Sequence, residues 1–347
     1  MATIKDIAKL SNVSTSTVSR VLNNDSSLSV TEETRKKVNE VAEKLQYTLP
    51  QRKSVKKQHE LKDMKIGLII YCSEKVEDED PYFLSIRQGV EQELYQYGLE
   101  ISKVIRWINY DSYESLSGLN SLIVIGKIDF DFLNPFFVQI QNIVFVDYSP
   151  NDEEFDSVIV DFEKATYKAL DHLLENGHAS IGFIGGTVFL HQFGSKAGSR
   201  QMDKRLKGFR KYMESKGLFN EDHVFIGDKF TTQTGYELMK KAISNNCLPT
   251  AFIIASDPMA IGAYRALEEA GISIPNEVSI VAFDDITIAQ YMTPPLTTIK
   301  VYSNEMGKAA VRLLDEKLNG REVSMKLVVP TKLIIRQSTV NKFENNR

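Results

Sequence analysis

Seven short, uninterrupted apolar runs separated by amphipathic stretches recur along the chain from residue 64 onward. Such runs alternating with helices are typical of parallel sheets that are covered on both faces. With the weaker runs the strands number about a dozen, too many for one sheet of this length. We therefore expect two α/β lobes whose strand ends face each other across a ligand cleft. The runs are residues 66–70, 122–125, 143–146, 158–160, 181–184, 252–254 and 280–283.

The first 45 residues show helical periodicity instead of strand-like runs. Apolar residues recur there at three- and four-residue spacing in three short stretches, which predicts three helices. Ser14 can cap the second helix, and Ser29 followed by Glu32 is typical of a capping box before the third. The short polar turn at 10–13 joins the first two helices and predicts a helix-turn-helix. The predicted buried positions are Ile4, Ile7, Ala8, Val18, Val21, Leu22, Val38, Val41, Ala42 and Leu45.

Charge is divided unevenly along the 347 residues. The first 65 residues hold 13 Lys and Arg against 8 Asp and Glu, and the remainder holds 29 against 38. A basic head on an acidic body indicates that the head alone meets a polyanion such as DNA. The N-terminus lacks an apolar secretory core and no apolar run is long enough to span a bilayer, so we expect a cytoplasmic protein that does not enter a membrane.

The cysteine and histidine content predicts neither a disulfide framework nor a metal site. Cys72 and Cys247 fit reduced structural thiols, and the five histidines are scattered without ligand spacing. We expect no cofactor. The sequence Gly185-Gly186-Thr187 lacks the Gly-Lys-Ser/Thr that a phosphate-binding loop needs, and no Ser/His/Asp or Cys/His arrangement has a supporting motif, so we do not expect an enzyme.

The exposed face of the predicted second helix carries short hydrogen-bonding side chains and one forked donor. These suit base edges in the major groove, although an ordinary solvated helix can carry the same residues. Residues 4–24, IKDIAKLSNVSTSTVSRVLNN, closely resemble the N-terminal signature of the lactose/galactose repressor (LacI-type) family. The resemblance implies that Thr15 and Ser16 read bases and that Arg20 contacts the major groove. It also implies base-edge or phosphate contacts from Ser14, Thr17, Ser19 and Asn23.

Residues 48–63 join the head (1–47) to the body. They are rich in Lys and Arg and poor in apolar residues, so they cannot fold alone and fit a solvated linker. In the resembled family this stretch becomes a hinge helix on operator DNA and inserts paired leucines into the minor groove. Here Val55 lies nearest the wedge position, whereas Leu49 and Leu61 are out of register, so the resemblance implies a shorter wedge.

The resemblance extends over nearly the whole chain. Residues 257–263, 283–285 and 294–299 match the family's body, which is similar to periplasmic sugar-binding proteins with two lobes joined by three crossovers. Asp80-Pro81-Tyr82-Phe83 and the Gly126-Lys127 step look more like its galactoside-responsive branch. The expected fold is α/β: a three-helix helix-turn-helix head and a periplasmic-binding-protein-like body of two Rossmann-like lobes. The implied body is 64–340, with 64–162 and 292–320 in the first lobe, 163–291 and 321–340 in the second, and a tail at 341–347.

A neutral sugar is held by forked donors, carboxylates and an aromatic platform in a preformed cleft. Arg205 matches the family's ligand-binding arginine, and Asp284 follows a strand at a point that faces the cleft. Simpler alternatives stay open: an ion pair for Arg205, helix caps for Asp284, Ser256 and Asp257, solvent for Lys127 and plain packing for the aromatic residues. The expected effector-binding residues are Tyr82, Phe83, Lys127, Arg205, Ser256, Asp284 and Tyr302.

Together these features predict a transcription repressor. A homodimer binds a pseudo-palindromic operator in double-stranded DNA, and a small sugar, galactose or a galactoside, controls its affinity. The tail lacks the apolar heptads of a tetramer-forming coil, which favours a dimer. Two alternatives stay open. The effector can be a purine or phosphoprotein corepressor, because the residues do not reveal the sign of the coupling. The chain can also be a sugar-binding or sugar-processing protein with a vestigial head.

Overall fold

The computed structural model describes residues 3–22, 30–45, 47, 64–107, 116–129, 140, 142–191, 198–245 and 248–343. Two compact units divide the chain between Asp63 and Met64, in agreement with the predicted start of the body. The predicted joint at 48–63, with Val55, lies outside the described residues, as does Asn23. No helix in the described part is both long and apolar enough to cross a membrane.

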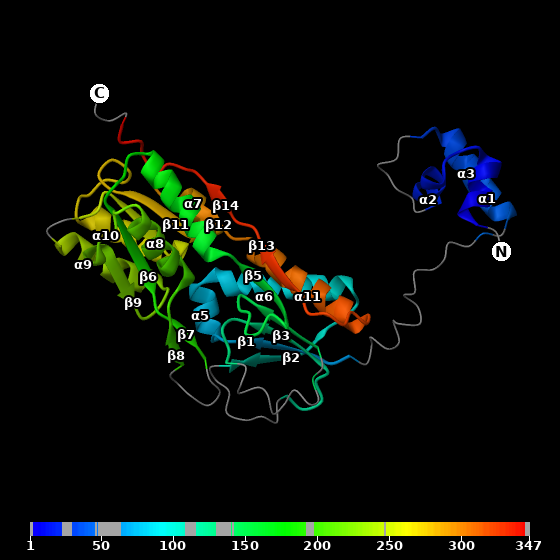
Figure 1. The fold of residues 1–347 in the computed structure, drawn as a ribbon, viewed down its shortest axis with the longest axis horizontal. Helices are drawn as coiled ribbons and strands as arrows, with labels where there is room; N and C mark the ends of the chain where they lie inside the picture. Colours follow the sequence, from blue (N-terminus) through cyan, green and yellow to red (C-terminus); the bar gives the residue numbers. More distant parts are fainter. Residues whose placement is uncertain are drawn as a thin grey trace. The chain divides into compact units, whose positions relative to one another are not determined.

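The head is a unit of three helices, as predicted (Figure 1). The predicted apolar positions form its core: six are buried and the others pack partly buried against them. Asn12 ends the first helix with a φ of 57°, a left-handed conformation that asparagine tolerates, and turns the chain toward the second. The helices are α1 (Ile4–Ser11), α2 (Thr15–Leu22) and α3 (Glu32–Lys44).

Side-chain caps begin the second and third helices of the head. The Ser14 hydroxyl accepts a hydrogen bond from the Thr17 N–H at 3.1 Å, so the predicted cap of α2 is confirmed. The cap of α3 differs from the prediction. Thr31 is the N-cap residue and accepts from the Thr34 N–H at 3.3 Å, so Glu32 is the first helical residue; Ser29 lies outside the described residues.

The first lobe of the body is a six-stranded parallel sheet in the order β13-β5-β4-β3-β1-β2. Its central strands β1, β3 and β5 are buried along their whole length, as their apolar runs predict. Helices α6 and α11 pack against each other, α6 also contacts β3, and α11 also contacts β4 and β5. The elements are β1 (Ile66–Ile70), α5 (Glu74–Glu79), α6 (Pro81–Gln96), β2 (Ile101–Arg106), β3 (Ser121–Ile125), β4 (Asn142–Val146), β5 (Asp156–Val160), α11 (Ser303–Leu318) and β13 (Lys326–Val329).

The second lobe repeats this arrangement with the order β14-β12-β11-β10-β6-β9. Its strands run parallel except for the edge strand β14, which pairs antiparallel with β12. Helices α9 and α10 pack together, as do α7 and α8, and β7 and β8 form a separate hairpin. The elements are α7 (Phe162–Glu175), β6 (Ile181–Gly186), β7 (Val188–Leu190), β8 (Ser199–Gln201), α8 (Lys204–Ser215), η4 (Glu221–His223), β9 (Val224–Gly227), α9 (Thr232–Ser244), β10 (Ala251–Ile254), α10 (Asp257–Glu269), β11 (Ser279–Asp284), η5 (Thr287–Tyr291), β12 (Thr297–Lys300) and β14 (Lys332–Ile334).

The late part of the chain crosses between the lobes differently from the prediction. The segment 292–320 is not all in the first lobe, because β12 pairs with β11 of the second sheet. The segment 321–340 is not all in the second lobe, because β13 pairs with β5 of the first sheet. The three crossovers therefore lie between β5 and α7, between β12 and α11, and between β13 and β14.

Candidate functional site

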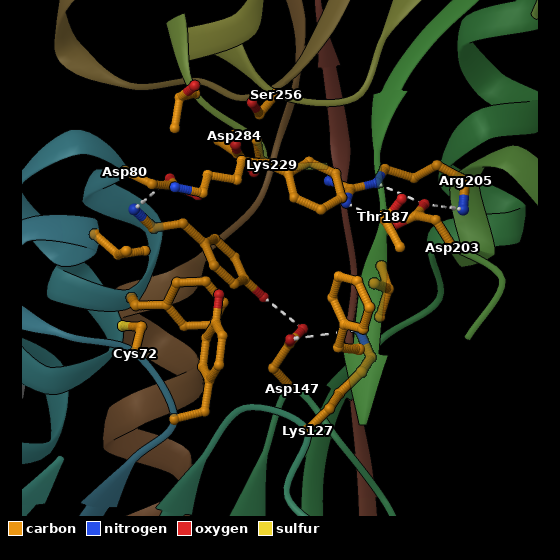
Figure 2. Close-up of a pocket in the computed structure, with 18 of the residues that line it drawn as sticks. Cys72, Asp80, Lys127, Asp147, Thr187, Asp203, Arg205, Lys229, Ser256 and Asp284 are labelled. Atoms are coloured by element: carbon orange, nitrogen blue, oxygen red, sulfur yellow. Dashed lines mark hydrogen bonds and ion pairs between the residues drawn. The ribbon is translucent and has the colours of Figure 1, made fainter. Parts of the chain in front are cut away.

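A cavity of about 360 Å³ lies between the two lobes, within the size range of small-molecule sites. In both lobes most of its lining residues follow the carboxyl ends of strands or begin helices, which is where open α/β sheets bind ligands. Six of the seven predicted effector-binding residues line it: Tyr82, Phe83, Lys127, Arg205, Ser256 and Asp284. Figure 2 labels the last four of these. Their placement agrees with the prediction, and their contact with a ligand stays a prediction.

Tyr302 does not line this cavity, which corrects its predicted place in the cleft wall. It is the N-cap residue of α11 and borders an adjoining hollow that shares Tyr82 and Asp284 with the cavity, and the Lys300 ammonium lies 5.7 Å from the centre of its ring. The reason is the strand pairing above. Because β12 belongs to the second sheet, Tyr302 falls on a crossover and not at a strand end of the first lobe.

Arg205 is held rigidly at the start of α8. Its Nε donates to Asp203 Oδ1 at 2.9 Å and its Nη2 to Asp203 Oδ2 at 2.7 Å, while Nη1 donates to the Ala255 carbonyl at 2.5 Å. The guanidinium carbon lies 5.0 Å from the ring centre of Phe162 and 4.9 Å from that of Phe230. The ion pair that the sequence left open for Arg205 therefore exists, and it exists inside the cavity (Figure 2).

Burial and pairing act oppositely on this ion pair. Burial by itself lowers the pKa of Arg205, but the Asp203 carboxylate outweighs it and raises that pKa. Burial by itself raises the pKa of Asp203, and the Arg205 charge outweighs it and lowers that pKa. Both groups therefore stay charged and present a fixed dipole to a ligand.

Asp284, the last residue of β11, is placed by an unusual backbone turn. Its φ is 110° and that of Asp285 is 58°, and residues other than glycine rarely adopt such positive φ values. Asp285 accepts hydrogen bonds from Lys300 Nζ at 3.1 Å and from Arg336 Nη2 at 2.6 Å, which fixes the turn from two sides. Burial and then repulsion from the Asp80 carboxylate raise the pKa of Asp284 well above its usual range.

The start of α10 supports the same turn. Ser256 is the N-cap residue and accepts from the Met259 N–H at 3.5 Å. Asp257, which the sequence also allowed as a cap, is instead the first helical residue and is fully buried. It accepts from the Thr298 hydroxyl at 2.7 Å and from the Ile286 N–H at 2.9 Å. The chain just after Asp285 is thereby tied to α10 and β12.

The first lobe contributes two further carboxylates. Asp147 follows β4 and accepts from the Tyr82 hydroxyl at 2.9 Å, and its other oxygen lies 4.0 Å from Lys127 Nζ (Figure 2). Asp80 is the N-cap residue of α6 and accepts from the Tyr82 N–H at 3.2 Å. Burial raises the pKa of Asp80 to about 6.

Aromatic rings form one wall of the cavity across the lobe boundary. The rings of Tyr71 and Phe83 lie 4.8 Å apart in an edge-to-face arrangement, and the His191 ring lies 5.0 Å from Tyr71. The backbone of His191 in the second lobe donates to the Lys127 carbonyl at 2.9 Å, and the Asp129 N–H donates to the His191 carbonyl at 2.9 Å. These hydrogen bonds join the lobes beside the cavity.

Several lining residues were missed by the sequence analysis. Asp147 carried the same signal as Asp284, since it directly follows an apolar run and could have been predicted from that position. Asp80 carried a weaker signal, an Asp-Pro step at a helix start. Tyr71, His191, Phe162 and Phe230 had none, because an aromatic residue near a strand end is usually core. No group of three metal-ligating side chains occurs in the described part of the chain.

The second helix of the head presents the predicted DNA-reading residues. Thr15, Ser16 and Arg20 are exposed, and Thr17 and Ser19 are partly buried. The Ser14 hydroxyl is exposed and hydrogen-bonded to those of Ser16, at 2.7 Å, and Thr17, at 2.8 Å. The short side chains are thus ordered at the start of α2, where a recognition helix contacts base edges.

Two family models match the chain. Residues 3–49 match bacterial regulatory proteins of the lacI family, and residues 170–339 match the periplasmic binding protein-like domain. The first match covers the described helices α1 to α3, and the second runs from α7 to the segment after β14.

Relatives match over nearly the full length. The HTH-type transcriptional repressor MelR of Bacillus subtilis is 41% identical over 97% of both chains. The HTH-type transcriptional regulator GanR of the same organism is 40% identical over 97% of this chain and 99% of its own. Among solved structures, the lac repressor dimer bound to operator and the anti-inducer ONPF is 25% identical, with a TM-score of 0.66 over 98% of this chain and 99% of that one.

Proposed function

The chain belongs to the lacI family of bacterial regulatory proteins, and on that premise we propose that galactose or a galactoside controls the affinity of this repressor for its operator. The observation that carries the proposal is the preformed cavity between the lobes. A ligand there that contacts Arg205 and Asp284 of one lobe and Tyr82 of the other favours one arrangement of the lobes over another. Such differential binding is what an allosteric effector requires.

The chemistry of the cavity suits a neutral sugar. Carboxylates accept hydrogen bonds from hydroxyls, Arg205 donates within a rigid fork, and the rings of Tyr71 and Phe83 suit the apolar face of a pyranose. The galactoside is favoured by the residues at 80–83 and 126–127, which resemble the galactoside-responsive branch of the family.

The head reads DNA as one of a pair. A single small head buries too little surface to be selective, whereas two heads on a homodimer gain affinity through effective concentration and read a pseudo-palindrome. The lac repressor structure, a dimer that holds an operator and a small ligand together, supports this arrangement for the present chain.

The decisive experiment measures operator affinity as sugar is added. An operator is selected from random palindromic DNA with the full chain, and its binding is followed by fluorescence anisotropy at fixed salt. We expect galactose or a methyl galactoside to weaken DNA binding. By linkage, operator must weaken sugar binding by the same factor, which calorimetry checks. Tighter DNA binding on sugar addition would make the ligand a corepressor, and no change with any sugar would refute control by sugar.

A matched pair of variants on α8 separates the cavity from the helix. Arg205→Lys removes the two-pronged grip on Asp203 and should lower sugar affinity roughly 10- to 100-fold. Arg210→Lys makes the same change at an arginine that pairs with Glu221 at a distance of 2.9 Å. Neither residue lines the cavity, so this variant should leave sugar affinity unchanged. Equal loss in both variants would point to damage of the helix.

The head is tested independently of the body. Arg20→Ala should weaken binding to the selected operator and relax its sequence preference, with a cost of about 1–3 kcal/mol if Arg20 contacts a base. Sugar affinity of the free protein should not change. A uniform loss on all DNA sequences would assign Arg20 to phosphate contact.

A further inference from the structure

Two carboxylates face the cavity from opposite lobes. Asp80 belongs to the first lobe, at the start of α6, and Asp284 to the second, at the end of β11. Figure 2 shows both labelled among the lining side chains. Among the described residues neither forms an ion pair within 4.0 Å, although Asp80 accepts one backbone N–H. Their remaining acceptor capacity is directed to whatever fills the cavity.

The buried or partly buried cations of the cavity, Arg205 and Lys127, have partners other than Asp80 and Asp284. The Arg205 charge is paired with Asp203 through Nε and Nη2, and Nη1 donates to the Ala255 carbonyl, which leaves one N–H on each terminal nitrogen for a ligand. Lys127 lies 4.0 Å from Asp147. The other two lysines of the lining, Lys204 and Lys229, are exposed, and among the described residues neither forms an ion pair within 4.0 Å with a carboxylate of the cavity.

This arrangement leaves an excess of negative charge in the interior. Four carboxylates that are buried or partly buried, those of Asp80, Asp147, Asp203 and Asp284, face the two cations Arg205 and Lys127. Two unpaired carboxylates in one low-dielectric cavity repel each other and disfavour their common ionisation. A ligand that donates hydroxyl hydrogens to both relieves that cost, whereas a ligand anion adds to it.

We propose that the cavity selects an uncharged, polyhydroxylated ligand over its phosphate ester, with Asp80 and Asp284 as hydroxyl acceptors that the ligand bridges across the two lobes. The inference rests on the proposed function only in taking this cavity as the effector site. It names the class of effector whichever sugar is bound. It also explains how a ligand would draw the two lobes together, because only a ligand with hydroxyl donors on two sides hydrogen-bonds to one carboxylate from each lobe.

The experiment compares sugars with their own phosphates on the full chain. Isothermal titration measures galactose against galactose 6-phosphate, glucose against glucose 6-phosphate, and ribose against ribose 5-phosphate. We expect the neutral member of the bound pair to be preferred by about 100-fold or more, since opposed like charges cost several kcal/mol. A phosphate that binds as tightly as its parent sugar overturns the proposal.

Variants assign the preference to the two carboxylates. Asp80→Asn and Asp284→Asn keep the side-chain shape and remove the charge, so each should weaken neutral-sugar binding about tenfold. Each should also reduce the ratio of the affinity for the sugar to the affinity for its phosphate by about tenfold or more. Asp222→Asn is the matched control, because Asp222 is an exposed carboxylate of η4 outside the cavity lining. An unchanged preference in both cavity variants, as in the control, overturns the assignment.

The outcomes also separate this proposal from the galactoside assignment. If galactose does not bind but glucose or ribose binds and its phosphate does not, the galactoside assignment fails and the charge selection stands. If galactose and its phosphate bind equally and both release the operator, the galactoside assignment stands and the charge selection fails. If no member of any pair binds, both fail.

Discussion

Each lobe of the body contains a buried aspartate gripped by an arginine through two hydrogen bonds, yet only one of these pairs borders the cavity. In the second lobe Arg205 grips Asp203 at 2.9 and 2.7 Å. In the first lobe Arg321 grips Asp156 at 2.9 and 2.8 Å. The two arginine side chains are 13% and 14% exposed, so their burial does not tell the pairs apart, although Arg321 also donates to Glu316 at 3.0 Å.

Their positions along the strands do tell them apart. Asp156 is the first residue of β5 and also accepts from the Met325 N–H at 2.7 Å, which ties the start of β13 to the sheet. Asp203 precedes α8 at the carboxyl ends of the second sheet, where the cavity lies. Because parallel sheets bind ligands at their carboxyl ends, the same pair is structural in one lobe and part of the site in the other.

Breaking either pair should lower the unfolding free energy, but only the pair at the cavity should affect sugar binding. Asp203→Ala leaves the buried Arg205 guanidinium without a carboxylate, which costs roughly 3–5 kcal/mol of unfolding free energy. Asp156→Ala leaves Arg321 paired with Glu316 at 3.0 Å and should cost less. Urea unfolding of the full chain measures that cost. Only Asp203→Ala should abolish sugar binding at a concentration of denaturant where both variants remain folded. If Asp156→Ala loses sugar binding as completely, the assignment of roles to the two pairs is wrong.

A second difference between the lobes concerns pH. Burial raises the pKa of Asp80 to about 6 from an ordinary value of 3.8, so its contribution to stability decreases as pH rises from 3.8 to about 6. For Asp203 the opposite holds. Burial is outweighed by Arg205 and its pKa is lowered, so its contribution is complete above pH 3.8 and is lost as pH falls through the lowered pKa.

The unfolding free energies of Asp80→Asn and Asp203→Asn should therefore differ from that of wild type in opposite directions. Relative to wild type, Asp80→Asn should gain unfolding free energy between about pH 4 and pH 7, by up to roughly 3 kcal/mol. Asp203→Asn should lose it over the same interval. Urea titrations at several pH values measure both. A profile of Asp80→Asn parallel to that of wild type would show that cavity water solvates this carboxylate fully.

The same contrast explains how much the sequence could predict. The seven apolar runs are central strands, and they could be predicted because the apolar character of consecutive residues indicates burial without any knowledge of distant partners. The edge strand β2, with three consecutive exposed residues, and β13, with its first three exposed, gave no such signal. Their place depends on strand pairing over long distances, and the error in the late lobe boundaries follows from that. The head was predictable almost completely, because its core contacts lie within 45 residues.

The cavity was predictable as single residues but not as an arrangement. Arg205 and Asp284 were found through resemblance and position after a strand. The rings of Phe162 and Phe230 that flank Arg205 come from segments 43 residues before and 25 after it, and only tertiary packing brings them together. The positive φ of Asp284 and Asp285 is likewise fixed by distant partners and not by local residue preference.

The smallest expected effect compares one tyrosine hydroxyl in each lobe. The Tyr82 hydroxyl donates to Asp147 at 2.9 Å in the first lobe, and that of Tyr264 donates to the Pro294 carbonyl at 3.2 Å in the second. Replacement of either by Phe removes one hydrogen bond and should cost about 1 kcal/mol in urea unfolding. Sugar affinity should fall, by up to about tenfold, only in Tyr82→Phe, because that hydroxyl orients a carboxylate of the cavity. Equal sugar affinity in the two variants would remove Asp147 from the set of ligand contacts and leave the first lobe with Asp80 as its polar anchor.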